Sequence, residues 1–139
     1  GEKLKTQKNY YNNLKNYLNF INSKKINKIN LLGKKNHFQI KKILKNTNVF
    51  ILGSKTEGLP ISLLEAMSMQ CFPIISKESN ISKIVVNNHN GLVFDLKERS
   101  FVNCILKYFK MTDKNKKIIA RNSKRTVINL NKVNEKINF

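Results

Sequence analysis

The stretch VFILGSKTEGLPISLLEAMSMQCFPIIS, residues 49–76, determines the expected fold of this chain. It begins and ends with short apolar runs, 49–52 and 72–76, whose length predicts strands covered on both faces. Between them, the loop 53–60 leads into a helix predicted from residue 62 to about residue 70. Two buried strands joined through a helix indicate a parallel pair, because parallel strands need a long crossover connection. The stretch therefore predicts an α/β fold.

Helical and strand patterns alternate on both sides of this stretch. Apolar periodicity predicts helices at 7–22, around 40–44, and at 81–86, 98–110 and 113–129, and further strands at 29–32, closed by Gly33, and at 92–94. Such alternation predicts one parallel sheet with flanking helices. We assign residues 1–129 to this domain and residues 130–139 to a polar C-terminal tail.

The net charge of +19 is the unusual feature of the composition, whereas 139 residues are an ordinary length for one domain. The charge comes mostly from Lys spread along the whole chain, while nucleic-acid-binding proteins usually concentrate charge on one face and add Arg or aromatic residues. Lys, Asn and Ile share AT-rich codons, so codon bias is the simpler explanation. The charge still attracts anions, including nucleotide phosphates and acidic lipid headgroups.

The two cysteines, Cys71 and Cys104, lie in apolar contexts without metal-ligand spacing. They predict buried thiols in a reducing compartment rather than disulfides or metal ligands. No apolar run approaches the length of a membrane span, about 18 residues, and no signal peptide is visible. These features indicate a cytoplasmic protein. His37 and His89 both lie in polar stretches and are interpreted as solvated loop residues.

Two carboxylates, Glu57 and Glu65, stand eight positions apart around a predicted helix start. Gly58 permits a tight turn and close approach of a ligand, and Pro60 suits a first helical turn. The N–H groups at the start of the helix then favour phosphate oxygens. Glu65 lies in an otherwise apolar helix, so a polar group should meet it. The structural alternative is that Glu57 only stabilises the helix dipole and that Glu65 forms an internal salt bridge.

The sequence SKTEGLP at 54–60, followed by LLEAM at 63–67, resembles the signature of retaining glycosyltransferases of the group 1, family 4-like type. Their hallmark is a pair of glutamates separated by seven residues. The resemblance covers most of residues 1–110 and includes the segments 29–33, 48–52, 71–76 and 90–94. It implies a Rossmann-like domain, the incomplete C-terminal half of a GT-B fold, which binds a nucleotide-sugar donor.

The same resemblance implies roles for individual residues. Glu57, the catalytic candidate, would contact hydroxyls of the transferred sugar, and Glu65 would hold the ribose hydroxyls. The remaining expected contacts are to the sugar and diphosphate, through the backbone around Gly58, Leu59, Pro60 and Ile61, and to the base, near Gly33, Lys34 and Lys35. The sugar would pass with retention to a glycan or lipid-linked acceptor. No metal or other cofactor is expected, because helix N-termini and basic side chains offset the diphosphate charge. Acceptors of this kind suggest peripheral contact with an anionic membrane.

Two departures from the family pattern bear on activity. Gln70 stands where the family usually has a glycine. In addition, Gly1 resembles the turn after the second strand of the domain, so two strands, a basic loop and the acceptor domain are expected to precede it. We therefore expect this chain alone not to transfer sugar. The alternatives left open are a noncatalytic remnant of the family and, less favoured, a basic nucleic-acid-binding domain.

Overall fold

A computed structural model describes residues 8–9, 12–16, 19–20, 23, 29–55, 60–78 and 83–137. The chain divides into two compact units, residues 1–36 and 37–139, which are described separately. In the first unit, the described residues of the predicted helix 7–22 are helical.

The predicted strand at 29–32 is wrong, because these residues have no regular secondary structure. Ile29, Leu31 and Leu32 are exposed by 41 to 51%. An apolar run becomes a strand only beside a neighbouring strand that takes up its backbone hydrogen bonds. In the described part of the chain, the sheet contains three strands, all from the second unit.

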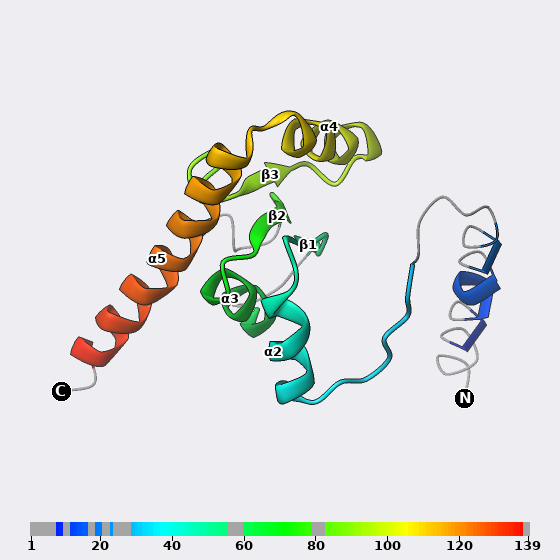
Figure 1. The fold of residues 1–139 in the computed structure, drawn as a ribbon, viewed down its shortest axis with the longest axis horizontal. Helices are drawn as coiled ribbons and strands as arrows, with labels where there is room; N and C mark the ends of the chain where they lie inside the picture. Colours follow the sequence, from blue (N-terminus) through cyan, green and yellow to red (C-terminus); the bar gives the residue numbers. More distant parts are fainter. Residues whose placement is uncertain are drawn as a thin grey trace. The chain divides into compact units, whose positions relative to one another are not determined.

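The second unit is a three-stranded sheet with helices on both sides (Figure 1). Its elements are α2 (His37–Lys45), β1 (Val49–Leu52), α3 (Ile61–Ser68), β2 (Phe72–Ser76), β3 (Leu92–Phe94), α4 (Glu98–Lys110) and α5 (Asp113–Ile137). The strand order is β1-β2-β3, and both pairs are parallel. The predicted α/β fold with a parallel sheet is therefore confirmed.

Side chains alternate between two apolar layers along each strand, as expected for a sheet buried on both faces. On one face, Phe72, Ile74, Leu92 and Phe94 pack with residues of α4 and with Ile119 of α5. On the other face, Ile75 packs with Leu63 and Met67 of α3 and with Val127 of α5. Helix α3 is thereby held over the centre of the sheet.

Helix α3 lies within two residues of its predicted bounds, whereas three other helices differ more from the predictions. Helix α2 begins at His37, so this residue is helical rather than part of a loop. Of the predicted helix 81–86, residues 81–82 lie outside the described residues, and helical structure ends at Lys83. Helix α5 continues to Ile137, beyond the predicted end at residue 129. None of the described helices is both long enough and apolar enough to cross a membrane.

Both cysteines donate to backbone carbonyls. Cys71 Sγ lies 3.4 Å from the Leu44 oxygen, and Cys104 Sγ lies 3.4 Å from the Val93 oxygen. Burial raises the pKa of both thiols. Because the thiolate is the reactive form, these are structural rather than nucleophilic cysteines.

Candidate functional site

The carboxyl ends of the strands meet at one edge of the sheet, where ligands bind in open parallel sheets. Ser76, at the end of β2, donates its hydroxyl to the Ser54 carbonyl just after β1 at 2.5 Å. Beside it, the Lys77 N–H donates to the Phe94 carbonyl at the end of β3 at 2.8 Å. These bonds align the three strand ends and place the loop after β1 next to the β2 terminus.

Helix α3 begins at this edge. Pro60 is the N-cap residue, and its carbonyl accepts from the N–H groups of Leu63 at 3.1 Å and Leu64 at 3.3 Å. The N–H groups of Ile61 and Ser62 precede these first bonds, so they have no acceptor within the helix. Ile61 is 72% exposed. The start of α3 therefore presents two backbone donors and the positive end of the helix dipole to a ligand.

Glu65 lies on the second turn of α3, roughly 7.5 Å from Pro60 at about 1.5 Å per residue. Its neighbours Ala66 and Met67 are buried, whereas the Glu65 side chain remains 23% exposed. Its Oε1 lies 2.8 Å from Nδ1 of His37, the first residue of α2. The polar partner that the sequence requires for Glu65 is thus His37.

The prediction that His37 is solvated is confirmed, since its side chain is 76% exposed, but the prediction that it lies in a loop is wrong. It begins α2 and lies three and seven positions before Ile40 and Leu44, the apolar residues that predict this helix. Residues at this spacing share one helix face. Extending the periodicity back to residue 37 would have placed His37 at the exposed end of the helix face that packs against α3.

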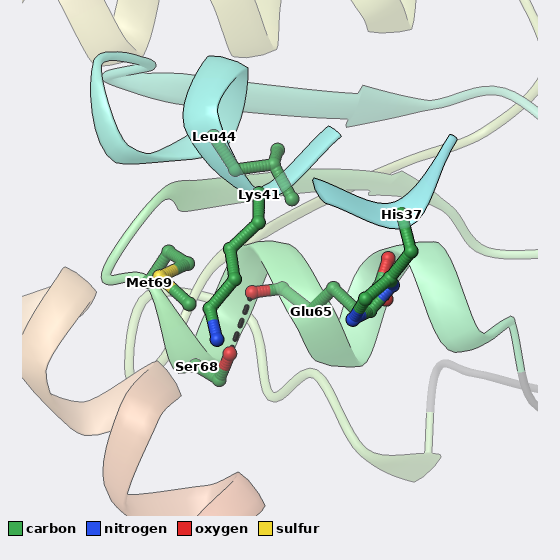
Figure 2. A pocket seen from close by; sticks show the side chains of 6 residues that line it. All are labelled: His37, Lys41, Leu44, Glu65, Ser68 and Met69. Carbon is green, nitrogen blue, oxygen red and sulfur yellow. Dashed lines mark hydrogen bonds and ion pairs between the residues drawn. The ribbon is translucent and has the colours of Figure 1, made fainter. Parts of the chain in front are cut away.

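Figure 2 shows a small recess between α2 and α3 that contains this pair. Its volume is about 140 Å³, and it is lined by His37, Lys41, Leu44, Glu65, Ser68 and Met69. Pockets that hold drug-sized ligands are larger, about 300–1,000 Å³. The recess therefore shapes the surroundings of the carboxylate, and a nucleotide would have to lie mainly along the carboxyl edge outside it.

The structure does not test several of the predicted donor contacts. Glu57, Gly58 and Leu59 lie outside the described residues. Gly33, with φ of +63°, belongs to the first unit together with the exposed Lys34 and the half-buried Lys35. Their roles near the sugar and the base remain predictions. His89 is exposed, as expected, and its carbonyl accepts from the Asn122 side chain at 3.0 Å.

Comparisons with solved structures agree with this fold. The C-terminal domain of a glycosyl transferase group 1 family protein from Francisella tularensis matches with a TM-score of 0.59 and 23% identity, over 73% of this chain and 51% of that chain. Sucrose-phosphate synthase from Thermosynechococcus elongatus matches with a TM-score of 0.68 and 18% identity, over 74% of this chain and 26% of that chain. At these identities the matches show the fold, that of the C-terminal half of a GT-B glycosyltransferase.

Sequence comparison gives the family. A curated relative, UDP-Gal:alpha-D-GlcNAc-diphosphoundecaprenol alpha-1,3-galactosyltransferase of Escherichia coli, is 34% identical over 120 residues. The match covers 85% of this chain and 30% of the relative, so the chain spans about a third of that protein's length. The sequence model of "Glycosyl transferases group 1" matches residues 9–125. The chain therefore belongs to the group 1 glycosyltransferases.

Proposed function

We propose that this chain forms the donor-binding part of a glycosyltransferase that transfers sugar from a nucleotide sugar, with retention, to a glycan or lipid-linked acceptor. The observation that carries the proposal is the half-buried carboxylate of Glu65, held by His37 beside the exposed start of α3. A carboxylate accepts hydrogen bonds from vicinal hydroxyls, and a helix start accepts phosphate oxygens. A nucleoside diphosphate has both groups, at a separation that fits the second turn of a helix.

The other expected roles belong to the same proposal. Glu57 would contact the transferred sugar, the backbone from Gly58 to Ile61 would meet the sugar and diphosphate, and Gly33–Lys35 would lie near the base. No metal would be required, because the helix dipole and nearby cations offset the diphosphate charge. We further propose that residues 1–139 bind the donor but do not complete transfer alone.

The location of the enzyme follows from its proposed substrate. The Escherichia coli relative is named for an acceptor linked to diphosphoundecaprenol, a membrane lipid. We propose a cytoplasmic enzyme that contacts the membrane surface peripherally. The net charge of +19 would favour such contact with anionic headgroups.

A thermal-shift comparison of UDP, GDP and ADP tests donor binding. A ligand present at about 100 times its Kd stabilises the folded state by about 2.7 kcal/mol, which raises Tm by several degrees. We expect one nucleotide to stabilise the chain and Glu65→Gln to weaken its binding by at least about tenfold, since a hydrogen bond to a charged group contributes about 1.5–3 kcal/mol.

Glu98→Gln is the matched control, because it makes the same substitution at an exposed carboxylate in the first turn of α4. It should leave the nucleotide shift unchanged. If none of the three nucleotides stabilises the chain, the proposal is contradicted. Stabilisation by DNA of any sequence, steeply weakened by salt and indifferent to Glu65→Gln, would instead favour a nucleic-acid-binding domain.

A further inference from the structure

The contact between His37 and Glu65 joins two helices that pack against each other. The distance of 2.8 Å lies in the range of charge-assisted hydrogen bonds, about 2.7–2.9 Å. A ring nitrogen this close to a carboxylate oxygen donates a hydrogen bond through its N–H, so Nδ1 is the donor in the neutral and in the charged ring. In Figure 2 the Glu65 side chain extends toward the imidazole and away from Lys41.

This pair contributes little to holding the helices together, because exposed ion pairs stabilise proteins weakly. Apolar packing fixes α2 instead: Leu44 is buried with Ala66 and Cys71. The Cys71 thiol also donates to the Leu44 carbonyl at 3.4 Å. The backbone of His37 is therefore positioned by the packing of α2, independently of the contact that its side chain makes. The main consequence of the pair is to restrict the rotamers of the Glu65 side chain.

The contact leaves the carboxylate able to bind a ligand. An ionised carboxylate has about four lone-pair positions on two oxygens. His37 uses one position on Oε1, so Oε2 and the remaining positions can accept from two neighbouring hydroxyls. A long side chain that is already oriented loses less conformational freedom when a ligand binds, and this raises affinity.

We propose that His37 is a positioning residue of the donor site, which acts by orienting the Glu65 carboxylate toward the two ribose hydroxyls of a nucleoside diphosphate. This inference rests on the proposed function and deepens it. It predicts that His37 affects recognition of the ribose and leaves recognition of the base and phosphates unchanged.

The experiment compares UDP with 2′-deoxy-UDP by isothermal titration calorimetry on residues 1–139, or the GDP or ADP pair if one of those nucleotides stabilises the chain. The wild-type chain should prefer the ribonucleotide by about tenfold, the factor expected for one charge-assisted hydrogen bond. His37→Ala should weaken UDP binding by up to about tenfold and leave 2′-deoxy-UDP binding nearly unchanged. The ratio of the two affinities should therefore fall toward one.

Two variants separate positioning from general structural damage. His37→Asn keeps a side-chain N–H one bond beyond Cγ, where Nδ1 stands, and should restore most of the preference. Lys42→Ala removes an exposed cation of α2 that does not line the recess and should leave the preference unchanged. A purely structural role for His37 would lower both affinities equally and keep their ratio.

Three other outcomes would contradict either the role of His37 or the proposed function. If Glu65→Gln abolishes the preference but His37→Ala keeps it, the role of His37 is refuted while the proposed function stands. If His37→Ala tightens UDP binding, His37 competes with the ribose and does not position the carboxylate. If the wild-type chain binds none of the nucleotides, the proposed function itself fails, and the role of His37 fails with it.

Discussion

At the scale of single residues, the backbone conformation of Gln70 explains how a glutamine replaces the glycine that the family usually has at this position. Its φ is +62°, the left-handed region that glycine adopts most easily. The Gln70 N–H donates to the Met67 carbonyl, and the Cys71 N–H donates to the Ala66 carbonyl, each at 3.0 Å. With Met69 as the C-cap, these two bonds form a Schellman motif that ends α3. The turn that a glycine would make is therefore preserved, at a cost in backbone strain.

We expect Gln70→Gly to stabilise the chain by about 0.5–1 kcal/mol. The left-handed conformation costs a non-glycine residue about 1–2 kcal/mol, partly offset by the larger entropy that glycine loses on folding. The Gln70 side chain is exposed, so little contact is lost. Urea denaturation measures the difference. Asn88→Gly is the control: its φ is +64°, and asparagine tolerates this region, so its gain should be smaller. Destabilisation by Gln70→Gly would mean that the glutamine side chain has a structural role.

At the scale of elements, β1 is an edge strand that pairs with β2 alone among the described strands. Ile51 of β1 and Ile74 of β2 are register partners and point to the same face of the sheet. Ile74 is fully buried, whereas Ile51 is 46% exposed. Helix α4 therefore packs over β2 on this face and leaves β1 partly exposed.

This difference predicts unequal costs for the same substitution. Ile74→Ala should cost about 2–5 kcal/mol of unfolding free energy, because it leaves a cavity in a closed core. Ile51→Ala should cost about 1 kcal/mol, mostly lost strand propensity. The two values follow from urea denaturation at several protein concentrations. Equal losses would show that Ile51 is covered in solution, and a concentration dependence would attribute the cover to a second copy of the chain.

How well elements could be predicted depends on whether their signal is local. The three paired strands have the bounds that their apolar runs predict, 49–52, 72–76 and 92–94. The run 29–32 is also mostly apolar, apart from Asn30, but it has no strand structure, because pairing depends on a neighbour that no local pattern specifies. The same distinction between local sequence and tertiary packing applies to the site. The need of Glu65 for a polar partner follows from its own helix, but the identity of His37 depends on how α2 packs against α3.

At the scale of the whole molecule, recognition of a donor and transfer of its sugar make different demands. Binding needs one surface, and under the proposed function this surface would be the carboxyl edge with the start of α3. Transfer also needs an acceptor held against the reacting carbon and groups aimed at the charge that develops in the transition state. The match to the Escherichia coli relative covers 30% of that protein, so most of that protein's length lies outside the match.

We therefore expect residues 1–139 to be protected by a nucleoside diphosphate but to release none from a nucleotide sugar. The purified chain would be incubated with UDP-galactose, UDP-glucose, UDP-N-acetylglucosamine and GDP-mannose, and free UDP or GDP would be measured, because both hydrolysis and transfer release it. Since the net charge of +19 attracts anions unspecifically, protection should be compared at low and raised salt. Protection that survives salt and disappears in Glu65→Gln, without nucleotide release, is the expected result. Release that is faster than in buffer and is lost in Glu57→Gln would show that this chain carries out the bond cleavage alone, and would place the groups needed for it within residues 1–139.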